Sequence, residues 1–284
     1  MNGNDIMGSI TGTASLIVVS NVRNSVGNGI TKPHFAMIEN TLCVIKGINN
    51  PEKHLVLFNE YFGYRLAGEL GLSIPEFGFA TINQETTFDN EDKRKYFTDG
   101  CLCFFTKYIE KTVPLRGVKQ LYGASAYDLI SLFLYDLLIC NNDRNPGNLL
   151  LRKPKAQNLI VYPIDYTHAF ELQAIWDRGQ LKRFVEDPRE KIELGKISKQ
   201  SVYQYIKEVR VYRGEEVEDC FSHFQYRLAR INLRDILEEI PDVLLEKITK
   251  EDLDYFIRFI EIRIDGLNEI RKFAQKEIIG GDQL

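Results

Sequence analysis

Residues 139–152 read ICNNDRNPGNLLLR, and residues 161–170 read VYPIDYTHAF. The first segment spaces Asp143 and Asn148 as D-x-x-x-x-N, and the second places Asp165 at the end of an apolar stretch. Phosphoryl transfer needs an oriented acceptor hydroxyl, a held triphosphate and a metal that neutralises charge. Asp143 suits the hydroxyl, whereas Asn148 and Asp165 offer the hard oxygen ligands that Mg²⁺ prefers. The pattern therefore predicts a site for ATP and Mg²⁺, with Asp143 as catalytic base.

Lys46 ends the apolar strand pattern TLCVIKG and predicts a cation at the edge of the core. A buried cation needs an anion, and Glu60, near the start of the next predicted helix, is the available carboxylate. A Lys–Glu pair of this kind positions the lysine on the α- and β-phosphates of ATP. A lysine that extends from a strand end into solvent is the alternative. The downstream Asp143 pattern favours the nucleotide role.

The segment SVGNGITKP at residues 25–33 lies between two predicted strands and predicts a loop around the ATP phosphates. Gly27 and Gly29 let backbone N–H groups approach phosphate oxygens, and Ser25 and Thr31 belong to the same loop. An ordinary hairpin turn is the alternative, because short glycine-rich loops are common. A further hypothesis is self-phosphorylation of Ser25 or Thr31, since a phosphate there would repel those of ATP.

The first part of the chain has the pattern of a mostly β half with one main helix. Apolar stretches bounded by turn residues predict strands at residues 15–20, 34–38, 41–47, 74–82 and 101–109. Apolar side chains at every fourth position predict a helix over Phe58–Leu70, ended by Gly71. Residues 89–100 are charged and lack periodicity, so we expect an exposed hairpin loop there.

The rest of the chain has the pattern of a mainly helical half. Ser125 and Asp128 form a capping box at the start of AYDLISLFLYDLLIC, a helix that is apolar on nearly every face. Two short strands, NLLLR and NLIVYPID, follow, and the chain beyond Glu171 has helical periodicity. Thr249 opens a long amphipathic run whose apolar stripe continues to Leu267.

These two halves predict a bilobal α+β fold with a cleft between the lobes. Residues 1–110 would form a β-rich N-lobe with the phosphate loop, Lys46 and Glu60. Residues 111–284 would form a larger helical C-lobe with the catalytic loop and the metal-binding Asp165. We expect ATP to bind in the cleft.

Composition bears on the expected partners and on the compartment of the protein. A net charge of −4 over 284 residues gives no reason to expect direct contact with nucleic acid or an anionic membrane. The five cysteines include no Cys-x-x-Cys pair, which favours a reducing compartment over a disulfide framework. No stretch has the order of a signal peptide, and the apolar runs are too short or too charged to span a bilayer. A cytoplasmic protein is expected.

Four segments carry a family resemblance: VIKGINN, LFNEYFGYRLAGELGLSIPEF, DLLICNNDRNPGNLLL and PIDYTHAF. They resemble the HipA-like kinase domain proteins of bacteria, over about residues 15–241. The resemblance implies a protein-kinase-like fold, distantly similar to the phosphatidylinositol kinases. It also implies that Lys46 binds the phosphates, that Asp143 is the catalytic base, and that Asn148 and Asp165 bind Mg²⁺. It further implies a hinge over residues 105–110, which includes Tyr108 and Glu110 and contacts adenine through its backbone.

The chain departs from the pattern of eukaryotic protein kinases at two places. Asn141 stands where many of them have the histidine of His-Arg-Asp, and Asp165 is followed by Tyr166 and Thr167 rather than Phe-Gly. Both departures weaken any inference about regulation by an activation loop. The persistence toxin HipA is longer than this chain, so neither toxin behaviour nor an antitoxin-like partner follows from the resemblance.

Three other residues near these motifs have structural interpretations. His168 is expected to hold the loop after Asp165 by a hydrogen bond rather than to take part in the chemistry. Arg144, next to the predicted base, is expected to form a structural ion pair. Trp176 is expected in the core.

The function predicted first is transfer of the ATP γ-phosphoryl group to a hydroxyl, on a Ser or Thr of a protein whose identity the sequence does not reveal. A kinase of the same fold that acts on a small molecule or lipid is the second hypothesis. A nucleotide-binding pseudokinase that scaffolds a partner is the third, although it would not need the lysine, the base and both metal ligands. A nucleotidyl transferase that uses the same cleft is the fourth.

Overall fold

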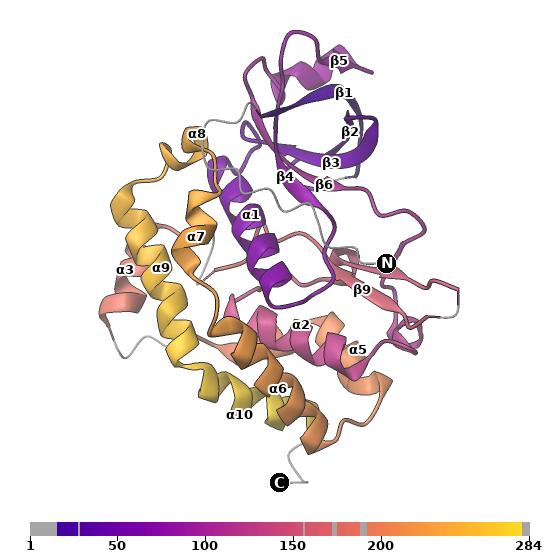
Figure 1. Ribbon diagram of the computed structural model, residues 1–284, viewed down its shortest axis with the longest axis vertical. Helices are drawn as coiled ribbons and strands as arrows, with labels where there is room; N and C mark the ends of the chain where they lie inside the picture. The colour runs from indigo at the N-terminus through magenta and orange to yellow at the C-terminus, as the bar shows by residue number, and fades with distance from the viewer. Residues whose placement is uncertain (1–15, 28, 156, 172–174, 188–191, 280–284) are drawn as a thin grey trace.

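The computed structural model describes residues 16–27, 29–155, 157–171, 175–187 and 192–279. Figure 1 shows a β-rich N-terminal region above a larger helical C-terminal part, with α1 between them. This mixed α+β architecture agrees with the fold class predicted from the sequence.

Six strands form the N-terminal sheet in the order β2-β3-β6-β4-β1-β5. The strands are β1 (Ile17–Ser25), β2 (His34–Ile38), β3 (Thr41–Gly47), β4 (Phe77–Thr81), β5 (Thr87–Phe88) and β6 (Leu102–Lys107). Because β1 also pairs with β2, the sheet closes on itself around a small apolar core that includes Val19, Ile45 and Cys103. Strand β1 continues to Ser25, five residues beyond its predicted end at Ser20, because its second half pairs with β2 and β5.

Helix α1 (His54–Glu69) begins one turn before the predicted start at Phe58. The amide of Asn50 donates to the carbonyls of Gly47 and Lys53, and this turn brings the chain into the helix early. The helix ends as predicted, because Gly71 has a φ of +84°, a left-handed conformation that favours glycine.

The C-terminal part is built from helices and one small sheet. The sheet contains β7 (Val113–Pro114), β8 (Leu149–Arg152) and β9 (Ile160–Pro163). The α-helices are α2 (Ala126–Leu138), α3 (Arg178–Glu186), α4 (Leu194–Ser198), α5 (Ser201–Val209), α6 (Gly214–Leu228), α7 (Leu233–Glu238), α8 (Asp242–Leu245), α9 (Lys250–Asp265) and α10 (Leu267–Ile279). The described residues also form 3₁₀ helices at Glu91–Lys95, Val118–Leu121 and Pro146–Asn148.

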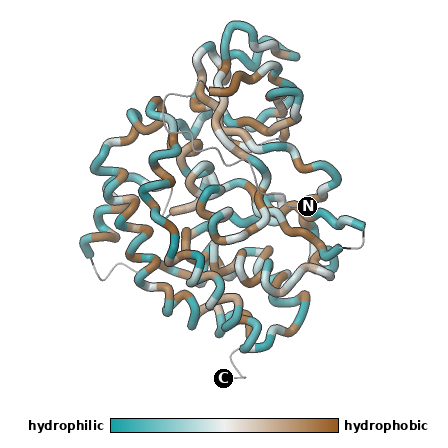
Figure 2. The backbone as a smooth tube through the Cα atoms, in the orientation of Figure 1, coloured by the Kyte–Doolittle hydropathy of each residue, from teal (hydrophilic) through white to brown (hydrophobic). Residues whose placement is uncertain are grey.

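Helix α2 is the central helix of this part, as its sequence predicts. The Ser125 hydroxyl accepts a hydrogen bond of 3.0 Å from the Asp128 amide and so caps the helix. Every residue from Leu129 to Leu138 is buried. Figure 2 shows hydrophilic residues along the outer turns of the surrounding helices, alternating with hydrophobic residues.

Two sequence predictions about local structure are wrong in part. The amphipathic run that starts after Thr249 is not one helix to Leu267, because it breaks at Gly266 into α9 and α10. Residues 89–100 are not only an exposed loop, since they contain a 3₁₀ helix and bury Phe97 against the sheet. Tertiary packing of one aromatic ring outweighs the charged character of this segment.

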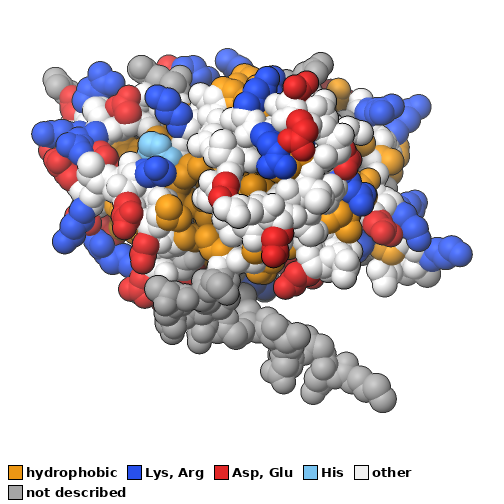
Figure 3. All heavy atoms as spheres, turned by 90° about the horizontal axis from the view of Figure 1, so that it is seen from above, with side chains coloured by type: hydrophobic (Ala, Val, Ile, Leu, Met, Phe, Trp, Pro, Cys, Tyr) orange, Lys and Arg blue, Asp and Glu red, His pale blue; other side chains and the backbone are white. Residues whose placement is uncertain are grey.

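The surface mixes charges of both signs. In Figure 3, which views the molecule from above, Lys and Arg side chains alternate with Asp and Glu side chains around exposed hydrophobic atoms. In the part of the chain that the structure describes, no helix has the length and apolar character needed to cross a membrane.

Candidate active site

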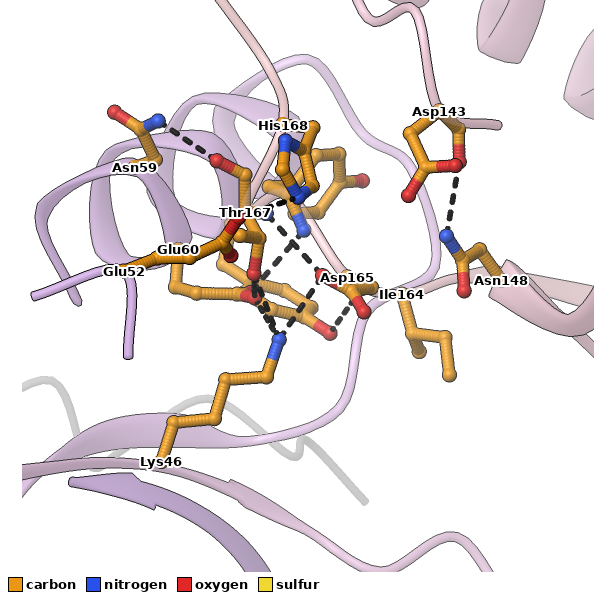
Figure 4. Close-up of polar contacts among 12 residues, drawn as sticks. Lys46, Glu52, Asn59, Glu60, Asp143, Asn148, Ile164, Asp165, Thr167 and His168 are labelled. Carbon is orange, nitrogen blue, oxygen red and sulfur yellow. Dashed lines mark hydrogen bonds and ion pairs between the residues drawn. The ribbon is translucent and has the colours of Figure 1, made fainter. Parts of the chain in front are cut away.

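The centre of the site is the ammonium group of Lys46, which lies at the end of β3. It binds Glu60 Oε1 on α1, Asp165 Oδ1 at 2.9 Å and the Thr167 hydroxyl at 2.9 Å (Figure 4). Asp165 lies two residues beyond the end of β9. The predicted Lys46–Glu60 pair is therefore formed, and the same lysine joins the N-terminal sheet to the segment that follows β9.

Electrostatic attraction between Lys46 and the two carboxylates determines which groups of this cluster are charged. Burial alone would lower the pKa of Lys46, but the carboxylates of Asp165 and Glu60 outweigh it and raise that pKa above its ordinary value. Burial also opposes ionisation of Asp165, yet the Lys46 ammonium holds the pKa of this carboxyl well below its usual range. Burial raises the pKa of Glu60, against the pull of Lys46. We interpret the cluster as an ion pair of Lys46 with Glu60 and with the ionised Asp165.

The backbone at Asp165 is held in an unusual conformation by its neighbours. Asp165 has a φ of +61°, which a residue with a side chain rarely adopts. Its amide donates to the Tyr64 hydroxyl at 3.3 Å, and the amide of Tyr166 donates to Glu60 Oε2 at 3.2 Å. Both partners are on α1. The helix thus fixes the direction in which the Asp165 side chain leaves the backbone.

The predicted catalytic loop is organised by its own asparagines. The Asn141 side chain accepts from the Asp143 amide at 3.1 Å, and the Asn145 side chain accepts from the Gly147 amide at 2.9 Å. The Asn148 side-chain amide donates to the Asp143 carbonyl at 2.9 Å, as Figure 4 shows. These contacts close the loop, so that the side chains of Asp143 and Asn148 lie together.

Arg144 forms the structural ion pair that the sequence predicts, and it does more. Its completely buried guanidinium binds Asp136 on α2 through two nitrogens, at 2.8 and 3.2 Å. It also donates to the carbonyls of Asn148, at 2.9 Å, and Ile164, at 2.6 Å. One side chain therefore connects the predicted catalytic loop, the central helix and the residue before Asp165.

Two oxygens in this arrangement suit a hard cation. Lys46 and the Thr167 amide use Oδ1 of Asp165, which leaves Oδ2 of this partly exposed carboxylate outside those bonds. Asn148 uses its NH₂ group on Asp143, which leaves its carbonyl oxygen as a ligand. A carboxylate and an amide oxygen are the kind of ligands that Mg²⁺ takes from protein. The described residues include no cluster of three His, Cys, Asp or Glu side chains that could hold a metal.

His168 has the loop-holding position expected of it. Its ring nitrogens contact Glu171 Oε1 at 2.7 Å and Glu52 Oε1 at 3.4 Å. The hydrogen bond with Glu171, together with the charges of Glu52 and Asp143, outweighs burial and raises the pKa of His168 to about 9. The imidazolium joins the turn before α1 to the segment after Asp165.

The predicted phosphate loop connects β1 to β2. The Ser25 hydroxyl donates to the carbonyl of Gly27 at 2.8 Å, and the amide of Val26 donates to the carbonyl of Pro33 at 3.0 Å. Thr31 is buried, whereas Ser25, Gly27 and Gly29 are exposed. Asn28 lies outside the described residues. His34 pairs with Ile45, so this loop lies at the same end of the sheet as Lys46.

The predicted hinge follows β6. The backbone amide of Tyr108 donates to the Leu42 carbonyl at 2.8 Å, so it continues the sheet and is not free for another acceptor. The Tyr108 ring is exposed and contacts Phe35 edge to face. Glu110 is exposed as well. These residues lie far along β3 from Lys46, beside Leu42 at its other end.

Sequence reasoning missed three residues of the site. Thr167 contacts both Lys46 and Glu60, Tyr64 orients Asp165, and Asp136 binds Arg144. Asp136 carried a signal, because a carboxylate within the apolar helix AYDLISLFLYDLLIC requires a buried partner. Trp176 is in the core as predicted, and its indole N–H donates to the Asn59 side chain.

A comparison with protein families places the chain among known sequences. A family model described as HipA-like kinase matches residues 19–212. No curated protein matches the chain.

The solved structures that are similar to it include three kinases. The Helicobacter pylori proinflammatory kinase CtkA has 14% identity and a TM-score of 0.56, with 90% of this chain and 97% of that chain covered. HipA of Shewanella oneidensis MR-1, in a complex with HipB and operator DNA, has 13% identity, coverage of 88% and 67%, and a TM-score of 0.45. The Rio2 kinase of Chaetomium thermophilum, in an ADP/Mg²⁺-phosphoaspartate complex, has 14% identity, coverage of 88% and 72%, and a TM-score of 0.37. The likeness to CtkA shows a shared fold.

Proposed function

The chain belongs to the HipA-like kinase family, and on that premise we propose that it transfers the γ-phosphoryl group of ATP to a Ser or Thr hydroxyl of a protein. The observation that carries this proposal is the position of Lys46, which binds Glu60 and Asp165 at once. A buried lysine with a purely structural role needs only one carboxylate to balance its charge. A lysine with a second, partly exposed carboxylate beside it is suited to a phosphate and its metal.

In the proposed reaction, Asp143 orients the acceptor hydroxyl and takes its proton. Lys46, held by Glu60, binds the α- and β-phosphates, and the Ser25–Pro33 loop covers them with its backbone. Mg²⁺, held by Asn148 and Asp165, would neutralise the charge that develops on the transferred group. Arg144 keeps the base and both metal ligands in register through the carbonyls that it binds.

We also propose a protein-kinase-like arrangement of two lobes, residues 1–110 and 111–284, with ATP in the cleft between them. The end of β6 and the residues up to Glu110 would form the hinge beside adenine. The Tyr108 amide is engaged in the sheet, and the Ile109 carbonyl accepts from the Thr112 hydroxyl at 2.9 Å. The Tyr108 ring, the Ile109 amide and the backbone of Glu110 are the groups that we propose for that contact.

The test uses purified protein with Mg²⁺ and ATP labelled at either the γ- or the α-phosphate. Asp165→Ala is compared with Asp254→Ala, which changes an exposed aspartate on α9. The proposal predicts transfer of the γ label to protein serine or threonine, abolished by Asp165→Ala and retained by Asp254→Ala. Omission of Mg²⁺ should abolish transfer as well.

Other outcomes would redirect the assignment. Transfer of the α label would indicate nucleotidyl transfer, and transfer of the γ label only to an added small molecule or lipid would indicate a different acceptor. Nucleotide binding without any transfer, over a broad set of acceptors, would support a pseudokinase. Failure to bind Mg²⁺ and ATP would contradict the proposed function altogether.

A further inference from the structure

The Lys46 ammonium has no proton to spare in this structure. An ammonium has three N–H donors, and Lys46 has three acceptors: Glu60, Asp165 and the Thr167 hydroxyl. A phosphate oxygen can therefore bind Lys46 only if one of these acceptors gives way. Which acceptor leaves decides where the lysine points when a nucleotide is bound.

Thr167 contacts all three charged groups. Its hydroxyl accepts from Lys46 at 2.9 Å and donates to Glu60 Oε1 at 2.9 Å, which uses its proton and one lone pair. Its backbone amide donates to Asp165 Oδ1 at 3.2 Å. Figure 4 shows the Thr167 side chain between Glu60 and the end of Lys46.

Thr167 cannot easily move away. The residue is buried, and its carbonyl accepts a hydrogen bond of 2.8 Å from the Asn59 side chain on α1. The preceding residue, Tyr166, is completely buried against Gly63 of the same helix. Backbone and side chain are therefore held on both sides of the hydroxyl.

The three acceptors differ in how readily they can release Lys46. Glu60 is buried, so its loss would leave an uncompensated carboxylate away from water. The Asp165 side chain is 34% exposed, and the bonds to Lys46 and to the Thr167 amide use Oδ1 and not Oδ2, so water or a cation can replace the lysine. Thr167 is fixed by its surroundings and already bridges to Glu60. Asp165 is the acceptor that can leave.

We propose that Thr167 is a positioning residue for Lys46. Thr167 and Glu60 accept hydrogen bonds from two of the three N–H groups of the Lys46 ammonium. When Asp165 releases the third N–H group, that group is directed at an ATP phosphate. This inference rests on the proposed function, because it assumes that Lys46 binds a nucleotide phosphate. It assigns a purpose to the threonine that stands in place of the glycine of Phe-Gly. Where a glycine would give the backbone conformational freedom, the threonine provides a hydroxyl in a fixed position that accepts a hydrogen bond from Lys46.

A purely structural role for the hydroxyl would have a different signature. Thr86 provides the comparison, because it is also buried and its hydroxyl donates to the Val19 carbonyl at 2.7 Å, within the N-terminal sheet. Loss of either hydroxyl should lower stability by a similar amount. Only loss of the Thr167 hydroxyl should affect binding of phosphates.

The experiment measures calorimetric affinities for adenosine and for the nonhydrolysable ATP analogue adenylyl imidodiphosphate with Mg²⁺. The proteins are the wild type, Thr167→Val, Thr167→Ser and Thr86→Val. Thr167→Val should weaken binding of the analogue about tenfold and leave adenosine binding unchanged, as expected for one misdirected charged hydrogen bond. Thr167→Ser should restore the affinity, and Thr86→Val should match the wild type in both affinities.

Three results would overturn the inference. Equal affinity of Thr167→Val and the wild type for the analogue would show that the hydroxyl does not direct Lys46. A parallel loss of adenosine binding, with a fall in melting temperature larger than that of Thr86→Val, would show a structural defect. Wild-type protein that does not bind the analogue would refute the proposed function and this inference with it.

Discussion

At the scale of single residues, Arg144 shows how much one buried charge can organise. Its guanidinium has two bonds to Asp136 and two to backbone carbonyls, so its charge is compensated without water. Arg144→Met would leave Asp136 buried and unpaired by an opposite charge, at a cost of about 3–5 kcal/mol in the free energy of unfolding. Chemical denaturation should show this loss. Arg258→Met, which removes an exposed pair with Glu261, should cost at most about 1 kcal/mol.

His168 gives a second prediction, on pH. Its pKa of about 9 in the folded protein lies above the ordinary value of 6.5, so its stabilising contribution is fully present below pH 6.5 and is lost as the pH rises through 9. His168→Gln should remove that part of the decline in melting temperature between these pH values. His223→Gln, at an exposed position on α6, should keep the wild-type profile. Identical profiles for all three proteins would contradict an ion pair at His168.

At the scale of elements, α1 packs so closely on the residues after β9 that there is no room for a side chain at Gly63. A Cβ atom on Gly63 would lie 2.7 Å from Cβ and Cγ of Tyr166, so Gly63→Ala must push the helix away. We expect a loss of about 1–3 kcal/mol in stability and a clear fall in nucleotide affinity, because Glu60 moves with the helix. Gly68→Ala meets only the flexible end of Ile74 and should be neutral or stabilising by up to about 1 kcal/mol. Urea denaturation and calorimetry of both variants test this contrast.

The same scale shows what the sequence could and could not predict. The Lys46–Glu60 pair, the cap of α2 and the glycine after α1 were predictable, because strand ends, capping residues and helix periodicity are local signals. Thr167 and Tyr64 were not, since their roles depend on α1 lying against a segment about a hundred positions away in the chain. The break at Gly266 was missed because the apolar stripe of α9 continues in phase beyond it. The roles of Asp143, Asn148 and the Ser25–Pro33 loop stay predictions.

At the scale of the whole molecule, α1 belongs to both halves of the fold. It carries Glu60 to the lysine of the N-terminal sheet, while Asn59 and Tyr64 bind the segment around Asp165. In Figure 1 it lies between the strands and α7. A helix held on so many sides cannot swing outward without breaking buried bonds. These bonds hold Glu60 beside Lys46 in this structure.

Helix α1 is also attached to the C-terminal part through Glu239, which lies just after α7. Its carboxylate accepts from Tyr61 at 2.8 Å and from two nitrogens of Arg65, at 2.7 and 3.1 Å. Glu239→Ala should loosen α1 by about 1 kcal/mol, which is roughly fivefold faster amide exchange in α1 under native conditions. Glu69→Ala removes the other partner of Arg65, within α1 itself, and should leave exchange nearly unchanged. Equal acceleration by both variants would mean that α1 is not anchored through α7, and the fixed Lys46–Glu60 pair would need another explanation.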